Sequence, residues 1–281
     1  MDSSRIKTHA KWLINSAPLF RPGHIPGNEA EVFTPVIHHD EKLNWQQLAE
    51  ELRLKKQENR KKHYHLPLGK YAEEIYTSYF NQVMDYKLLQ HNVQVKKAHK
   101  TYGEVDYLLQ INERIYHVEL AVKFYLLYQD PSLPHHWIGP NAKDTLQKKL
   151  EKNARAFSLT KQTNKQWVKQ AQTWQWLIKG CWFIHPNQKN LTFPFAQPNS
   201  EFGWWLSSSE LDLLPDGEYI IPDKLDWMCI SKTYTSFDQH HFNSQIEAHF
   251  KDQQKALMCW NITLKKRICI VQAGWPDLQA H

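Results

Sequence analysis

Residues 103–127 read GEVDYLLQINERIYHVELAVKFYLL, and their pattern predicts a tight β-hairpin. An alternating segment leads through a polar turn at Asn112-Glu113 into a longer alternating segment. Because side chains alternate along a strand, Glu104 and Asp106 share one face of the first strand. By the same rule, one face of the second strand carries His117, Glu119, Ala121 and Lys123.

Acidic side chains on two neighbouring strands can converge on one patch. Carboxylate oxygens are the ligands that Mg²⁺ or Mn²⁺ prefers, and a nearby ammonium can hold a nucleophilic water or offset developing charge. The hairpin therefore predicts a metal-dependent site. The other interpretation is a half-exposed hairpin whose polar face is only solvated.

The composition is that of an ordinary globular protein. The chain has 281 residues, of which 41% are hydrophobic and 23% charged, enough for one large domain or two small ones. Its formal net charge of +6 is compatible with a polyanionic partner such as nucleic acid and does not require one.

The cysteine spacing and the apolar runs indicate the cellular compartment in which the protein is expected. Four cysteines occur without a CxxC pair or a zinc-ligand spacing, which predicts reduced thiols in a cytoplasmic protein. The N-terminal sequence lacks an apolar signal core, and no apolar run is long enough to span a bilayer. We therefore expect no membrane partner.

Helix and strand patterns flank the hairpin on both sides. Helical periodicity predicts a helix over residues 69–83, with Glu73 at the border of its apolar face, where a carboxylate can look into a cleft or simply face water. A strand is expected over 88–97, a strand over 173–185, and a helix over 141–157. The predicted inward side of that last helix consists of Leu146, Leu150, Ala154 and Phe157.

The resulting order, α-β-β-β-α-β, predicts an α/β core built on a mixed sheet flanked by helices. It occupies residues 67–186. A helical and loop extension precedes it at 1–66, with a helix over 45–54 capped by Asn44, and an α+β region follows at 187–281.

Two basic segments could contact a phosphate backbone. The run at residues 53–62 includes Lys61 and Lys62, and Lys148, Lys152 and Arg155 share the outer face of the helix at 141–157. Such contacts give affinity without base choice. Solvated helix faces would produce the same pattern.

The ordered set of segments resembles the PD-(D/E)XK superfamily of restriction-endonuclease-like nucleases. It is still more similar to a bacterial family of unknown function usually placed there. The similar segments are WLINSAPLF at 12–20, LGKYAEEIY at 68–76, GEVDYLL at 103–109, HVELAVKFYLL at 117–127, WIGPNAKDTLQKKL at 137–150 and GWWL at 203–206.

The resemblance implies a restriction-endonuclease-like fold and Mg²⁺-dependent hydrolysis of nucleic-acid phosphodiesters. Asp106 matches the superfamily's metal-binding aspartate, Glu119 its second acid and Lys123 its catalytic lysine. Glu73 matches the first-helix glutamate that often completes the metal site. The lysines at 61, 62, 148 and 152 would then contact nucleic acid.

The sequence departs from the superfamily at one spacing. The usual last motif is Glu-x-Lys, whereas here three residues separate Glu119 from Lys123, and four residues of strand span roughly 13 Å. A bulge could shorten the path. Alternatively, Ala121 occupies the acid position and Glu73 or Glu104 supplies the missing carboxylate, or the site is catalytically inactive.

Two further functions follow from these alternatives. A catalytically inactive nuclease-like scaffold would bind nucleic acid or a protein partner without cutting it, and the tryptophan-rich C-terminal region could serve as its interaction surface. A metal-dependent hydrolase with another substrate is the third possibility, and no residue pattern identifies that substrate.

Overall fold

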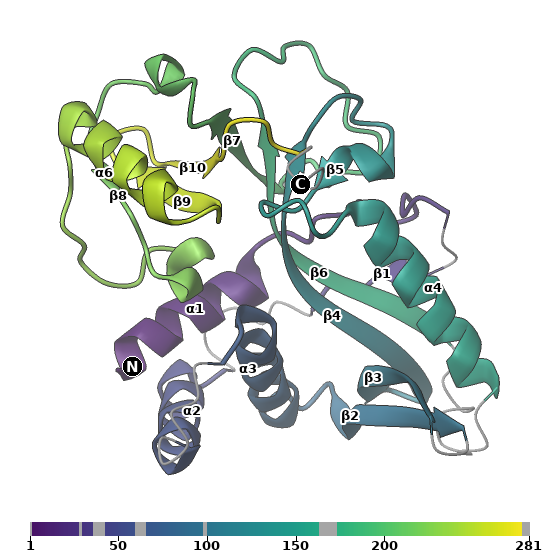
Figure 1. Cartoon of the computed structure of the whole chain (residues 1–281). Helices are drawn as coiled ribbons and strands as arrows, with labels where there is room; N and C mark the ends of the chain where they lie inside the picture. Colours follow the sequence, from purple (N-terminus) through teal and green to yellow (C-terminus); the bar gives the residue numbers. More distant parts are fainter. Residues whose placement is uncertain are drawn as a thin grey trace. The chain divides into compact units, whose positions relative to one another are not determined.

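A computed structural model describes residues 2–27, 30–35, 43–59, 66–97, 100–162 and 173–276 (Figure 1). The fold is mixed α/β, as expected. The helices are α1 (Ser3–Asn15), α2 (Trp45–Asn59), α3 (Leu68–Gln82), α4 (Leu146–Gln162) and α6 (Gln239–Asp252), with short 3₁₀ turns η2 (Pro134–His136), η3 (Leu211–Leu213) and η4 (Lys224–Trp227). No helix of these ranges combines the length and apolar character needed to cross a membrane.

The strands form a large mixed sheet. They are β1 (Glu31–Val32), β2 (Lys87–Lys97), β3 (Lys100–Ile111), β4 (Arg114–Leu127), β5 (Trp137–Ile138), β6 (Thr173–Ile184), β7 (Glu201–Ser207), β8 (Tyr219–Ile220), β9 (Leu257–Asn261) and β10 (Lys266–Val271). Their hydrogen-bonded order is β2-β3-β4-β6-β7-β10-β9-β8. The β2-β3-β4 and β8-β9-β10 groups pair antiparallel, whereas β7 pairs parallel with both β6 and β10. The predicted mixed sheet is thus confirmed.

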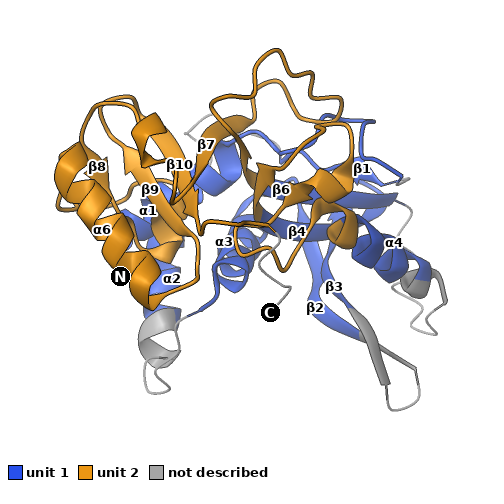
Figure 2. Cartoon of the chain, turned by 45° about the horizontal axis from the view of Figure 1, so that its top comes forward, with its two compact units in different colours: residues 1–122, 150–179 blue, residues 123–149, 180–281 orange. Residues whose placement is uncertain are grey.

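The chain packs as two compact units (Figure 2). Unit 1 comprises residues 1–122 and 150–179, and unit 2 comprises residues 123–149 and 180–281. These limits differ from the predicted boundaries at 66/67 and 186/187, so that three-part division stays a prediction. Both β4 and β6 contribute residues to each unit.

In unit 1, helices α1, α2 and α3 pack against one another, as Figure 1 shows. The apolar face of α3 is aromatic: Tyr76, Tyr79 and Phe80 are at most 1% exposed, and their rings lie in contact. The predicted start of α2 is confirmed, because Asn44 Oδ1 accepts a hydrogen bond from the Gln47 amide at 2.9 Å.

In unit 2, helix α6 covers the sheet formed by β7 to β10. Tyr219 of β8 stacks on Phe242 of α6, with ring centroids 4.3 Å apart, and Ile246 of α6 is fully buried in the same cluster. Apolar segments at 203–206, 219–221 and 267–272 fall on β7, β8 and β10, so the predicted α+β character of residues 187–281 agrees with the strands and helix α6 found there.

Helix α4 differs from its prediction in two respects. It begins at Leu146 rather than Asn141, because residues 139–144 form a turn in which Gly139 N–H bonds the Asp144 carbonyl and Ala142 has φ 55°. Ala154 is exposed, so its predicted inward position is wrong. Asn153 is 1% exposed and takes that position, because the buried face continues from Leu150 by three residues rather than four.

Candidate functional site

Asp106 lies where the regular pairing of the hairpin ends. The β3–β4 register runs from Ile111 opposite Arg114 to Tyr107 opposite Val118. At the next position, Oδ2 of Asp106 accepts a hydrogen bond from the Leu120 amide at 2.9 Å. Since that amide follows directly on Glu119, the bonded oxygen of Asp106 lies within about 5 Å of the Glu119 Cα. The structure therefore brings the two predicted acids to neighbouring positions.

The Glu119 carboxylate is buried and paired with a histidine. Its Oε1 lies 2.7 Å from His117 Nε2, and the residues are 6% and 0% exposed. The Phe157 ring packs edge-on against the imidazole at a centroid distance of 5.0 Å. The predicted common face of His117 and Glu119 is confirmed.

Glu73 belongs to a polar group that we call the Lys70 cluster: Lys70, Glu73, Asn92 and Glu104. Lys70 Nζ lies 2.7 Å from Glu73 Oε2 and 3.4 Å from Glu104 Oε1. The Asn92 amide, oriented with its nitrogen toward the acids, donates to both of those oxygens at 3.1 Å. Two carboxylates from a helix and a strand thus converge on one cation.

The charges of this cluster shape the pKa of Lys70. Partial burial of the ammonium lowers its pKa, but the hydrogen bonds and charges of Glu73 and Glu104 outweigh that effect and raise the pKa above its ordinary value. The side chains of Lys70 and Glu104 are 48% and 37% exposed, against 14% for Glu73. Solvent therefore reaches the cluster.

Two side chains of β3 contact helix α3 beside the cluster. Glu104 contacts Lys70 of α3, and three residues later the Tyr107 hydroxyl donates to the Glu73 carbonyl at 2.7 Å. In a regular strand these two side chains would point to opposite faces. Asn92, which lies in the β2 partner segment, has φ 51°, outside the strand region. The alternating pattern did not predict this departure of Asn92 from extended geometry, although an asparagine within a strand pattern is a signal of one.

Lys123 lies in unit 2, whereas the three predicted acids lie in unit 1. Its Nζ is 2.5 Å from Asp144 Oδ2, in the turn that precedes α4. The Lys123 backbone is held close to β6, because a Cβ added to Gly180 would overlap the Lys123 carbonyl oxygen. Asp144, which no sequence pattern indicated, is thus the partner of the predicted catalytic lysine.

The remaining predicted residues are basic. Lys148 and Lys152 are exposed on α4, as expected for either a solvated face or a phosphate contact. Lys61 and Lys62 lie outside the described residues.

Within the described ranges, no group of three or more His, Cys, Asp or Glu side chains has the geometry of a metal centre. Cys181, Cys229, Cys259 and Cys269 form no disulfide, as predicted.

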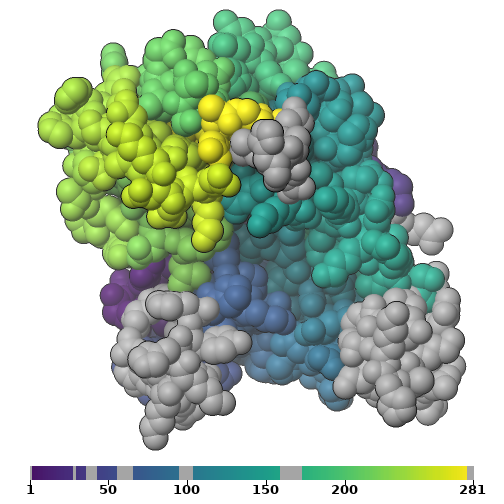
Figure 3. All heavy atoms as spheres, viewed as in Figure 1, coloured from purple at the N-terminus to yellow at the C-terminus, as the bar shows by residue number. Residues whose placement is uncertain are grey.

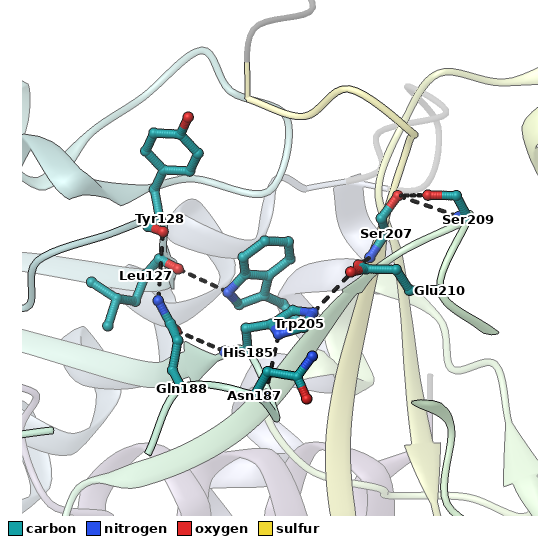
Figure 4. Close-up of polar contacts among 9 residues, drawn as sticks. All are labelled: Leu127, Tyr128, His185, Asn187, Gln188, Trp205, Ser207, Ser209 and Glu210. Atoms are coloured by element: carbon teal, nitrogen blue, oxygen red, sulfur yellow. Dashed lines mark hydrogen bonds and ion pairs between the residues drawn. The ribbon is translucent and has the colours of Figure 1, made fainter. Parts of the chain in front are cut away.

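A second polar network lies in unit 2 and was not predicted (Figure 4). His185 Nε2 lies 3.3 Å from Glu210 Oε2, while its Nδ1 accepts a hydrogen bond from the Asn187 amide. The Ser207 and Ser209 hydroxyls bond each other at 2.8 Å. Because neither hydroxyl bonds the imidazole, the network serves to hold the chain after β6 and β7 rather than to activate a serine.

Comparisons with known proteins give one match. No curated protein and no solved structure is detectably similar to this chain. Residues 8–272 match the family described as "Domain of unknown function (DUF1853)", and this match covers nearly the whole sequence. The chain therefore belongs to the DUF1853 family.

Proposed function

We propose that this protein hydrolyses phosphodiester bonds of nucleic acid with the help of a divalent metal ion bound near the Lys70 cluster. The observation that carries the proposal is the convergence of Glu73 and Glu104 on one cation. Carboxylate oxygens that already surround an ammonium suit Mg²⁺ or Mn²⁺, which are hard cations with oxygen ligands. A restriction-endonuclease-like core and a nucleic-acid partner belong to the same proposal.

Three acids would form the proposed metal site. Glu73 and Glu104 would hold the ion, and Asp106, two residues further along β3, would be the third acid of the proposed site. When bound, the ion would polarise the phosphate and lower the pKa of an attacking water. Lys70 would share the two carboxylates with the ion, and its ammonium would offset negative charge on the reacting phosphate.

Glu119 and Lys123 keep the roles that the resemblance implies only if they release their partners. Glu119 would have to leave His117, and Lys123 would have to leave Asp144. Glu104 therefore replaces Glu119 as the second acid in this proposal, an option that the stretched spacing between Glu119 and Lys123 had left open.

The experiment compares cleavage of single- and double-stranded DNA and RNA in the presence of Mg²⁺ or Mn²⁺, with metal binding followed by calorimetry. Glu73→Gln, Glu104→Gln and Asp106→Asn should each reduce metal-dependent cleavage by about 100-fold or more. Lys70→Met should also reduce cleavage, yet it should strengthen metal binding, because the carboxylates lose their competing cation. Glu113→Gln, an exposed acid at the hairpin turn, is the matched control and should change neither readout.

The ion pairs of Glu119 and Lys123 favour a second candidate function, a non-catalytic scaffold that binds nucleic acid or a protein. In that case Glu119 only supports the fold. Glu119→Gln should then preserve stability better than Glu119→Ala, which leaves the His117 Nε2 without its acceptor at a cost of about 1–3 kcal/mol. Absence of cleavage and of metal-binding heat in the wild type, with retained nucleic-acid binding, would reject the hydrolase and support the scaffold.

A further inference from the structure

Unit 2 contains a cavity of about 240 Å³ that the proposed hydrolase site does not use. We call it the α6–β9 pocket. It lies between the end of α6, the start of β9 and the segment at η4, and Figure 3 shows the yellow-green atoms of the α6–β9 region at the molecular surface. The lining residues that matter here are Lys224, Trp227, His249, Lys255, Leu257 and Met258.

The pocket is positively charged. Its lining includes two lysines and a histidine and no aspartate or glutamate. Lys224 Nζ lies 3.6 Å from the centroid of the Trp227 ring, and partial burial, with the nearby charge of Lys255, lowers the pKa of this ammonium. In the described part of the chain neither lysine forms an ion pair, and the neighbouring Asp223 is paired with Lys232.

Hydrogen bonds hold the wall of the pocket in place. His249 Nε2 lies 2.7 Å from the Lys255 carbonyl oxygen, so this nitrogen is the donor. The Ala256 amide donates to Asn141 Oδ1 at 3.1 Å. The turn that carries Lys255 is therefore tied to α6 on one side and to residue 141 on the other, and the cationic site is formed before any ligand arrives.

We propose that the α6–β9 pocket binds a small organic phosphate. A phosphate monoester carries nearly two negative charges at neutral pH and three acceptor oxygens, which match two ammonium groups better than a carboxylate would. Leu257 and Met258 are 8% and 1% exposed and give the pocket an apolar floor for the organic part of the ligand. A volume of about 240 Å³ suits a small molecule or the end of a strand.

The test is calorimetric titration of the full chain with ribose 5-phosphate, ribose, inorganic phosphate, and a dinucleotide with or without a 5′-phosphate. Ribose 5-phosphate should bind saturably and ribose should not bind. Lys224→Met and Lys255→Met should each weaken binding at least 10-fold. Lys251→Met, an exposed lysine of α6 outside the lining, is the matched control and should bind like the wild type.

The outcomes separate clearly. If ribose 5-phosphate does not bind, or binds all four proteins equally, the pocket is not a phosphate site. If inorganic phosphate binds as tightly as ribose 5-phosphate, the apolar floor does not contribute to binding and the organic part of the proposal is wrong.

The dinucleotide distinguishes two sources of the phosphate. Tighter binding of the 5′-phosphorylated dinucleotide would identify a strand end as the ligand, and tighter binding of ribose 5-phosphate would identify a free small molecule. Because Lys224 and Lys255 lie outside the Lys70 cluster, this result is independent of whether the protein cleaves nucleic acid.

Discussion

A buried lysine is expected to make the stability of this fold depend on pH. Lys179, on β6, is 1% exposed, and its ammonium donates to the Ser16 carbonyl without an acidic partner at that contact. Burial lowers its pKa to about 7. The protonated form of such a lysine destabilises the folded state, because an ammonium loses much of its hydration on burial.

The pKa of Lys179 gives a signed prediction for stability. Between about pH 7 and the ordinary lysine pKa near 10.5, the unfolded chain binds a proton that the folded chain has released, so the free energy of unfolding should rise with pH. The slope from one proton is at most about 1.4 kcal/mol per pH unit. Lys179→Met should remove this rise, whereas the exposed Lys189→Met should keep it. Urea unfolding at pH 6.5, 8 and 9.5 measures the slopes, and equal slopes in all three proteins would contradict the prediction.

Among the secondary-structure elements, the contact between β4 and β6 depends on a glycine. Gly180 has φ +145°, a conformation that residues with a Cβ rarely adopt. A Cβ at this position would overlap the Lys123 carbonyl oxygen and lie 2.7 Å from the carbonyl carbon. These are backbone atoms of a paired strand, so the clash cannot be relieved by moving a flexible side chain.

Gly180→Ala should therefore destabilise the protein by at least about 2 kcal/mol, through strain and displacement of β4. Gly69→Ala is the matched control, because no atom lies within 4 Å of its added Cβ in helix α3. Alanine there should be neutral or stabilise by up to about 1 kcal/mol. Thermal and urea unfolding measure both changes. If the Gly180→Ala protein is as stable as the wild type, β4 and β6 can move apart at this position without loss of folding free energy, and the prediction is wrong.

For the molecule as a whole, the net charge of +6 favours polyanionic partners only in a general way. In the proposed function, a more specific contribution would come from exposed lysines such as Lys148 and Lys152, which are four residues apart on α4 and so share a face. In that proposal, their contacts with nucleic acid would go to phosphates, which carry no sequence information.

Double substitution of Lys148 and Lys152 by glutamine should weaken binding of DNA and RNA alike, without changing sequence preference. It should also reduce the steepness of log K against log salt by about 2, one unit for each lysine–phosphate ion pair that the substitution removes. Fluorescence anisotropy between about 50 and 300 mM salt measures this slope. Lys251→Gln with Lys265→Gln, on α6 and the β9–β10 turn, is the charge-matched control. An equal reduction of the slope in the control would mean that only the overall charge matters.

The longer helices and strands between residues 67 and 186 can be predicted from the amino-acid pattern alone. Periods of 2 and 3.6 residues predicted the hairpin, helix α3 and the mixed α/β class, because one buried face of each element has to be apolar along its whole length. Asn44 marked the start of α2, since an asparagine side chain can replace the missing helical acceptor. Glu73 was placed at the border of an apolar face without a choice between cleft and solvent, and its side chain is 14% exposed.

The partners of the charged groups, by contrast, are set by tertiary packing. The pairing of Glu119 with His117, of Lys123 with Asp144, and of Glu104 with Lys70 depends on strand register, on the turn before α4 and on the contact between β3 and α3. Alternation assigns a side chain to a face, but it does not say which element covers that face or where a strand departs from regular geometry. Those choices are made by packing between segments far apart in the chain, and packing leaves no period in the sequence.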